Sequence, residues 1–368
     1  MSVCDFSEGH FAVDRDDFMI DLSQKPKPAA TTPAVPVLDL SMGARDSDPL
    51  LCKVLLPYRA VFYPLGFAVE VITNEEAVLA IVARCWGGLH QLHTNPMLQV
   101  RIIVSEGGSA ECPPAPVLRA QHNLLSVVAD AYNHAVCDLT QGLSLVWLNY
   151  AALQHPKYLC YHFIETAALV LINTSYAIPI HAACVSRYGH GMLLTADSGA
   201  GKSTLSYACA RAGWTFISDD GSYLLCNGDR PRVVGNCRQV RFRPSAKELF
   251  PELHGRDLTP RIKGKPSIEI PTSELQLITA EQATIHSIIL LNRHPSAVTE
   301  LVPLPRGIAS QHFSAVLNQY PTEVVRESQT AGLQQLSEVD VYELRYWDLQ
   351  PAIDCLELLA RSSEAHVL

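Results

Sequence analysis

The spacing of apolar and polar positions predicts folded structure from about residue 49 onward. Residues 25–37 are instead rich in Pro, Ala and Thr, a composition that favours an extended chain over a packed element. We therefore expect residues 1–48 to form a flexible N-terminal tail. Beyond it, apolar residues alternate with polar ones over 98–104, as in a strand, and recur at helical spacing over 77–85.

Residues 49–150 carry the pattern of an α+β domain. The predicted strands and hairpin runs are 61–63, 67–72, 98–104, 124–131, 135–139 and 143–148. Asn74 can cap the helix over 77–85, which ends at the Gly pair that begins with Gly87. No catalytic pattern occurs in this stretch, so we interpret it as an accessory domain.

Three residues of the accessory domain invite a chemical role, but a structural one is favoured. His90 and His93 resemble a pair of metal ligands, yet two histidines without a third ligand are usually ordinary solvated residues. Trp86 is expected to lie in the core and not to serve as a cofactor platform.

Residues 151–368 mix helical and strand patterns, which predicts an α/β domain. An apolar helix follows Pro156, and two strands joined by a tight turn at 188–191 lead into the apolar run 191–195. Helical spacing then extends to Gly213, and 214–218 is again a strand. A hairpin is predicted to pair 223–225 with 233–234.

Composition and charge exclude several classes of function. The 368 residues are 48% apolar and 18% charged, which is typical of a globular protein, and the net charge of −9 argues against a nucleic-acid partner. The N-terminus lacks a basic segment followed by an apolar one, and the most apolar stretch, 167–185, is interrupted by polar residues. We therefore expect neither a signal peptide nor a membrane partner.

The cysteines predict a cytoplasmic protein. There are eleven, and no two have the C-x-x-C spacing. Those expected to be reduced core thiols include Cys4, Cys52, Cys85, Cys112, Cys137, Cys184, Cys209 and Cys355.

A glycine-rich motif between the strand 191–195 and the following helix predicts a phosphate-binding loop. Its residues are Ala196, Asp197, Ser198, Gly199, Ala200, Gly201, Lys202, Ser203 and Thr204. Strand, glycine-rich loop and helix are the context that this mechanism needs, because backbone N–H groups then converge on a phosphate at the positive end of the helix. The motif predicts ATP and Mg²⁺ as ligands.

Each position of the loop has a physical reason. Gly199 and Gly201 let the backbone curl around a phosphate. Lys202 reaches the β- and γ-oxygens and the Ser203 hydroxyl offers a ligand to Mg²⁺, whereas Thr204 is expected to lie in the helix without touching metal. Ala196 stands where the common pattern has Gly, and Ala is accepted at that place in many phosphate loops.

Two carboxylates follow the strand 214–218. Beside a phosphate loop, one of Asp219 and Asp220 can hold Mg²⁺ and the other can accept a proton from an attacking hydroxyl. The alternative is a simple Asp-Asp-Gly turn before the hairpin. The adjacent phosphate loop favours the chemical interpretation.

Residues 176–226 resemble the catalytic core of the HPr kinase/phosphorylase family, which is related to ATP-dependent phosphoenolpyruvate carboxykinase. The resemblance rests on His181-Ala182-Ala183, the loop 196–203, Gly213 and the pair Asp219-Asp220. It implies an HPr-kinase/carboxykinase-like P-loop domain over 151–368. The segments 240–244 and 263–266 also look like parts of such proteins.

The resemblance also implies roles. Asp220 matches the residue that takes the proton from the acceptor serine, and His181 matches a histidine that lines the phosphate pocket. Lys202 and Ser203 match the phosphate and Mg²⁺ contacts, and Asp219 is then the metal-side carboxylate. The family's Gly-rich signature with its Glu ligand is absent, and the best stand-in is Glu269.

The sequence thus predicts an ATP-dependent kinase that phosphorylates a serine-type hydroxyl of a protein, a peptide or a small compound. Two alternatives stay open, a nucleotide sensor without phosphotransfer and a carboxykinase-like enzyme of small molecules. The resemblance further implies a homo-oligomer, as is frequent among related kinases.

Overall fold

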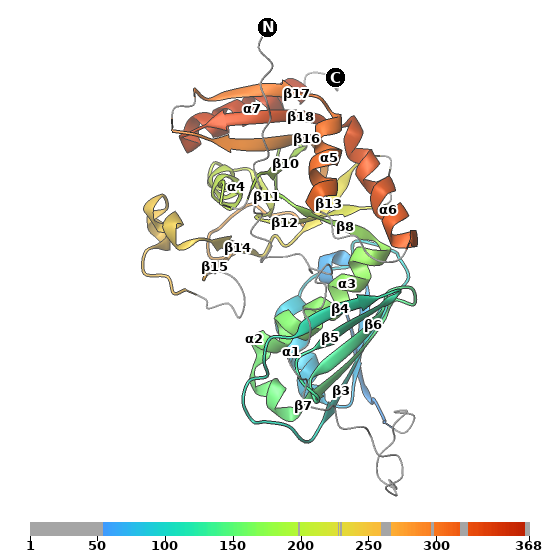
Figure 1. The fold of residues 1–368 in the computed structure, drawn as a ribbon. Helices are drawn as coiled ribbons and strands as arrows, with labels where there is room; N and C mark the ends of the chain where they lie inside the picture. The colour runs from blue at the N-terminus through green and yellow to red at the C-terminus, as the bar shows by residue number, and fades with distance from the viewer. Residues whose placement is uncertain are drawn as a thin grey trace, which may run out of the picture. The chain divides into compact units, whose positions relative to one another are not determined.

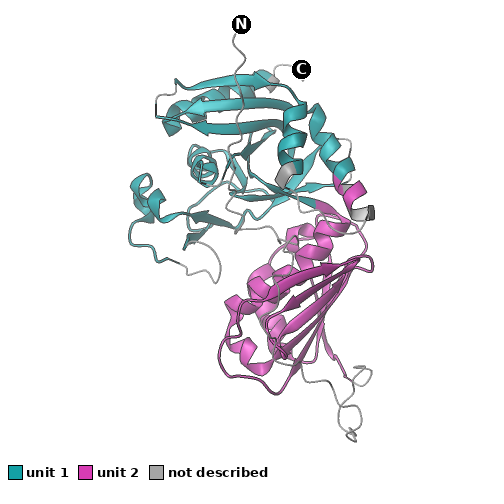
Figure 2. Cartoon of the chain, viewed as in Figure 1, with its two compact units in different colours: residues 1–19, 178–317, 330–368 teal, residues 20–177, 318–329 magenta. Residues whose placement is uncertain are grey.

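The computed structural model describes residues 54–364 except 198, 227, 229, 259–265, 296–297 and 317–322. The predicted tail 1–48 and Ser198 lie outside the described residues. The chain is a mixed α/β protein with several sheets (Figure 1). It divides into two units (Figure 2). The N-terminal unit holds the described residues through Ala177 together with 323–329, and the C-terminal unit holds the others.

The N-terminal unit is built on a seven-stranded sheet. Its strands, in spatial order, are β1 (Tyr58–Phe62), β2 (Val69–Thr73), β3 (Leu98–Ser105), β7 (Leu143–Asn149), β6 (His134–Asp138), β5 (Leu124–Val128) and β4 (Val117–Gln121). β3 runs parallel to both neighbours, and the other pairs are antiparallel. The helices α1 (Glu76–Trp86) and α3 (Glu165–Ser175) pack against the sheet. Trp86 is buried in this core, as predicted.

The apolar helix after Pro156 belongs to the N-terminal unit. It begins as α2 (Pro156–Leu159), passes through a π-helical turn at Cys160–Ile164 and continues as α3. α3 packs on β3, β6 and β7, and the buried Ser144 hydroxyl of β7 donates to the Ala167 carbonyl at 2.9 Å. The chain therefore passes from the N-terminal unit to the C-terminal unit between Ala177 and Ile178, and not at the predicted boundary after residue 150.

The start of α1 differs from the prediction. Glu75, not Asn74, is the N-cap residue, and its carboxylate accepts from the Ala77 N–H. The Asn74 side chain instead extends the pairing of β2 with β3, because its Nδ2 donates to the Val104 carbonyl at 2.7 Å and its Oδ1 accepts from the Val104 N–H at 2.8 Å. Asn74 thus satisfies two strand groups beyond the last residue of β2.

The cysteine prediction is wrong for Cys85, which forms a disulfide with Cys160. The two lie 75 residues apart in sequence but meet because α1 packs against the π-helical turn. Cys137, Cys184 and Cys209 are buried thiols as expected, whereas Cys112 is exposed and Cys355 is only partly buried. Cys4 and Cys52 lie outside the described residues.

The C-terminal unit is built on a nine-stranded sheet. Seven of its strands follow one another in space in the order β11 (Thr215–Ser218), β9 (Ala183–Arg187), β10 (His190–Thr195), β16 (Gln282–Arg293), β13 (Arg232–Gly235), β12 (Gly221–Leu225) and β8 (Ala177–His181). The other two strands branch from β16: β18 (Asp340–Tyr346) pairs with β16, and β17 (Glu300–Leu304) pairs with β18. β16 is parallel to both β10 and β18. The unit also holds a ribbon of β14 (Gln239–Phe242) with β15 (Ile268–Pro271) and the helices α4 (Lys202–Arg211), α5 (Gly307–Val316) and α7 (Leu349–Glu364). The helix α6 (Glu323–Gln334) is divided between the two units, and its part from Thr330 onward belongs to the C-terminal one.

The strand before the glycine-rich loop is buried on both faces. Met192 and Leu194 pack in one core cluster with residues of α4 and α7, and Leu193 packs in a second cluster with Phe313 of α5. This explains the continuous apolar run, because a strand covered on both faces shows no polar alternation. The predicted hairpin of β9 and β10, the helix α4 and the strand β11 are all confirmed.

We predict that Asn74→Ala destabilises the chain by about 2 kcal/mol, since it leaves the Val104 N–H and carbonyl without their partner. Urea unfolding of the full chain measures the effect. Glu75→Ala is the matched control: its capping contact is exposed and 3.4 Å long, so it should lower stability by only about 0.5 kcal/mol. Equal losses in the two variants would contradict the role given to Asn74.

Candidate nucleotide-binding site

The candidate site lies where the parallel strands β10, β16 and β18 end. The glycine-rich loop follows β10, Arg293 is the last residue of β16, and Trp347 directly follows β18. The register pairs Arg293 with Tyr346, and the His294 N–H donates to the Tyr346 carbonyl at 2.9 Å. In α/β sheets, ligands bind outside the carboxyl ends of such strands.

The backbone of the loop requires its glycines. Gly199 has φ of 87° and Gly201, the N-cap residue of α4, has φ of 103°, a region that other residues rarely adopt. A Cβ at Gly201 would also lie 3.0 Å from the Tyr346 hydroxyl, whereas one at Gly199 would meet no atom within 4 Å. The loop therefore approaches the sheet at Gly201 and leaves open space at Gly199.

Lys202 lies folded against the loop. It is only 5% exposed, and its Nζ donates to the Ala196 carbonyl at 2.9 Å and to the Asp197 carbonyl at 3.5 Å. The ammonium group thus lies beside the start of the loop, and the loop itself leads into the positive N-terminal end of α4. The two positive contributions make this point attractive to an anion.

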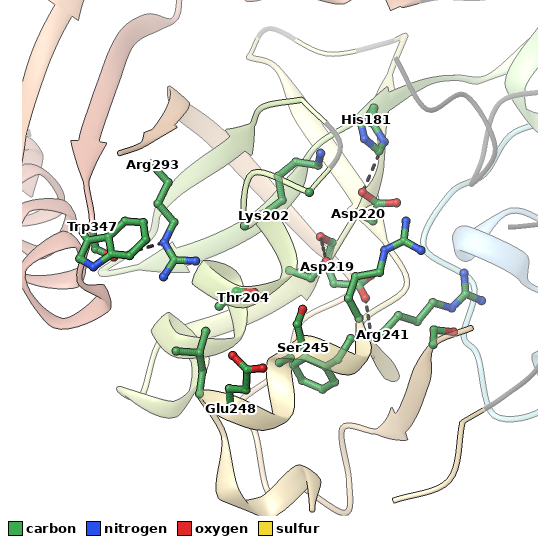
Figure 3. Close-up of a pocket in the computed structure, with 18 of the residues that line it drawn as sticks. His181, Lys202, Thr204, Asp219, Asp220, Arg241, Ser245, Glu248, Arg293 and Trp347 are labelled. Atoms are coloured by element: carbon green, nitrogen blue, oxygen red, sulfur yellow. Dashed lines mark hydrogen bonds and ion pairs between the residues drawn. The ribbon is translucent and has the colours of Figure 1, made fainter. Parts of the chain in front are cut away.

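A cavity of about 560 Å³ opens beside the loop (Figure 3). Its wall includes eight of the residues predicted for the site, namely His181, Gly199, Gly201, Lys202, Ser203, Thr204, Asp219 and Asp220. Residues from β8, the loop, α4 and the segment after β11 are therefore brought together on one cavity wall. Ala196, Asp197 and Ala200 belong to the loop but are not among the lining residues.

Asp219 is a buried carboxylate. Its Oδ2 accepts from the Arg241 backbone N–H at 2.6 Å, and its own carbonyl accepts from the Ser203 hydroxyl at 3.3 Å. Burial raises the pKa of Asp219 to about 6. The positive charge of the Arg241 guanidinium lowers this pKa, whereas the neighbouring Asp220 carboxylate raises it.

Asp220 lines the cavity beside His181. The His181 Nδ1 and Asp220 Oδ1 are 3.4 Å apart, and their side chains are 24% and 19% exposed. His181 ends β8, and Asp220 follows β11 by two residues. Figure 3 shows the His181 ring and the Asp220 carboxylate facing each other across this contact.

Several cavity residues were not assigned a role from the sequence. Arg241 and Arg243, from β14 and the residue after it, line the cavity, as do Arg293, Trp347 and Asp348. The last three could have been suspected from their place directly at or after apolar strand patterns. That β16 and β18 lie next to the loop, however, is information that only the sheet order contains.

Neither Glu269, the stand-in for a metal ligand, nor the pair His90 and His93, for which a structural role was favoured, is among the residues that line the cavity. Glu269 of β15 faces Arg241 across the β14–β15 ribbon, with the Arg241 Nε 3.6 Å from its Oε1, and it is not among the lining residues. In the N-terminal unit the His93 ring stacks on Phe67 at 4.2 Å. In the described part of the chain, no three His, Cys, Asp or Glu side chains are grouped as metal ligands would be.

Comparison with known proteins yields a distant structural likeness. No family model matches the chain, and no curated protein matches it. Among solved structures, the HPr(Ser) kinase/phosphatase from Coxiella burnetii aligns with 51% of this chain and 93% of its own, at 11% identity and a TM-score of 0.32. At that score, the function of the bacterial protein is not transferred on the strength of the match. No helix in the described residues is long and apolar enough to cross a membrane.

We predict that Asp219→Asn stabilises the protein near pH 7 and that the gain disappears below about pH 4. Folding raises the pKa of Asp219, so between about pH 4 and 6 the folded state binds the proton more tightly than the unfolded chain. The unfolding free energy of the parent therefore falls as pH rises through this window, by up to about 3 kcal/mol.

Urea unfolding at several pH values checks this prediction. Asn keeps an oxygen that can accept from the Arg241 N–H, and Asp348→Asn, which removes an exposed carboxylate, is the control. A parallel pH dependence of the Asp219→Asn variant and the parent would refute the assignment of a buried, destabilised carboxylate.

Proposed function

We propose that this protein is an ATP-dependent kinase that transfers the γ-phosphate to a serine-type hydroxyl of a protein, a peptide or a small acceptor. Its C-terminal unit would be a P-loop domain of the HPr-kinase kind. One observation carries the proposal: Lys202, at the N-terminus of α4, and Asp220, a carboxylate held by His181, line the same cavity. Phosphate binding and proton acceptance, the two requirements of such a transfer, are thereby combined.

The residues present fit ATP and Mg²⁺. A volume of about 560 Å³ is in the range of small-molecule sites. The open space beside Gly199 leaves room for a phosphate where a side chain would intrude. Hydroxyl and carboxylate oxygens, which Ser203 and Asp219 provide, are the donors that Mg²⁺ prefers.

The chain's own residues would divide the work as follows. Lys202 exchanges its contacts with the loop carbonyls for phosphate oxygens, and Ser203 and Asp219 hold the metal side of the site. Asp220 orients the acceptor hydroxyl and takes its proton, while His181 positions the carboxylate. When bound, Mg²⁺ supplies charge neutralisation on the phosphates. Most of the rate enhancement then comes from positioning and electrostatics.

A nucleotide sensor is the second candidate function, and the position of Glu269 favours it. This side chain, the best stand-in for an additional metal ligand, contacts Arg241 and accepts from the Ser267 hydroxyl at 3.3 Å, and it does not itself line the cavity. With this carboxylate engaged elsewhere, Ser203 and Asp219 are the proposed metal contacts, and a sensor would need no more than these. A carboxykinase-like reaction on a small molecule would use the same loop. The identity of the acceptor distinguishes it from the kinase and from the sensor.

We predict that Lys202→Ala weakens ATP binding about 10- to 100-fold, the value of one or two charge-assisted hydrogen bonds. Isothermal titration with ATP and Mg²⁺ measures it, and circular dichroism checks that the fold is kept. Lys247→Ala removes a lysine that bonds the Arg256 carbonyl and does not line the cavity, so it should bind like the parent. Unchanged affinity in Lys202→Ala would rule out the phosphate-loop assignment.

A second variant separates the kinase from the sensor. Asp220→Asn should bind ATP with similar affinity, because Lys202 and the loop are intact, yet lose about 10²- to 10⁴-fold in phosphate transfer. Transfer from labelled ATP to a library of serine-containing peptides and hydroxyl compounds is the measurement, and Asp354→Asn on α7 is the control.

If Asp220→Asn transfers phosphate at the parent rate, Asp220 is not the base. A parent protein that binds ATP tightly but phosphorylates none of these acceptors would instead support the sensor.

A further inference from the structure

An arginine and a tryptophan form a stacked pair on the cavity wall. The guanidinium carbon of Arg293 lies 4.7 Å from the centre of the Trp347 ring, and its Nε donates to the Trp347 carbonyl at 3.3 Å. The indole is nevertheless 41% exposed. Trp86 and Trp214 are buried and fill the cores of their units, whereas Trp347 is exposed. Core packing therefore does not explain a large aromatic ring at position 347.

The pair and the proposed base lie at separate parts of the cavity. In Figure 3, Arg293 and Trp347 are on one side of Lys202, and His181 and Asp220 are on the other. Thr204, on the first turn of α4, lies in this view between Lys202 and Trp347 and lower than both. A triphosphate in the loop with its γ-phosphate toward Asp220 therefore extends its other end away from Asp220, toward the side of Thr204 and the pair.

We propose that Arg293 and Trp347 form the platform on which the base of the bound nucleotide stacks. This inference rests on the proposed function, because it needs a nucleotide with its phosphates at the loop. A purine presents a flat π surface, and both an indole and a guanidinium stack on such surfaces. The pair thus recognises the base, whereas Lys202 and the loop recognise the phosphates.

The backbone holds the platform in place. Arg293 ends β16 and Trp347 follows β18, and these neighbouring parallel strands stay paired up to the hydrogen bond from the His294 N–H to the Tyr346 carbonyl. Tyr346 itself is fully buried under the loop, with its hydroxyl 3.0 Å from the point where a Cβ of Gly201 would lie. The distance between platform and phosphate loop is therefore set by rigid elements of the sheet.

The test compares ATP with inorganic tripolyphosphate, a probe that has the phosphates and no base. In isothermal titrations of the full chain with Mg²⁺, Trp347→Ala should weaken ATP binding about 5- to 150-fold. Tripolyphosphate binding should stay within about twofold of the parent. Trp347→Phe, which keeps an aromatic face, should recover most of the ATP affinity, and Arg293→Ala should show a loss for ATP alone.

Tyr188 offers a matched control. It is an exposed aromatic residue with the Arg187 guanidinium 4.8 Å from its ring centre, but it does not line the cavity. Tyr188→Ala should bind both probes like the parent. A fall in ATP affinity of the same size in this control would overturn the proposal, because the loss at Trp347 would then not be specific to the platform.

The outcomes separate the inference from the proposed function. If Lys202→Ala weakens both probes while Trp347→Ala weakens neither, or weakens both equally, the phosphate loop stands and the base platform is refuted. If the parent binds neither ATP nor tripolyphosphate, the proposed function fails and the platform fails with it. A loss in Trp347→Ala for ATP alone, recovered by Trp347→Phe, supports the platform.

Discussion

The parallel pairing of β10, β16 and β18 is the constraint on which the rest of the site depends. Parallel neighbours end at one edge of a sheet, so the loop after β10, Arg293 and Trp347 come together from distant parts of the chain. Burial on both faces holds this arrangement, because Leu193 packs in one core cluster and its neighbours Met192 and Leu194 in the other. A register shift of one residue would exchange these faces.

The site accumulates features that are unfavourable for stability. Lys202 and Asp219 are charged groups buried close to the loop. Each has a local compensation: loop carbonyls accept from the ammonium group, and the Arg241 N–H donates to the carboxylate. Buried charged groups of this kind cluster at functional sites more often than elsewhere.

The N-terminal unit shows where local patterns stop being informative. Asn74 has the residue type of a helix cap, and it precedes a helix, yet its amide is used to extend a strand pair with Val104. Cys85 has the spacing of a core thiol on α1, but its sulfur lies beside that of Cys160. In both cases the competing partner comes from a distant segment, and no periodicity within one element reports such a partner.

The sequence by itself determined the local structure of the loop. The strand of 191–195, the glycines with positive φ and the position of Lys202 at the start of a helix follow from short-range spacing, and short-range sterics enforce them. A family-like spacing also related His181, Asp219 and Asp220 to the loop, and the three line the same cavity, while their roles stay predictions. Only the tertiary structure decided that α3 joins the N-terminal sheet, that Glu269 faces Arg241, and that Arg293 and Trp347 share the cavity. These outcomes depend on strand order and packing between distant segments, which the periodicity of one segment does not encode.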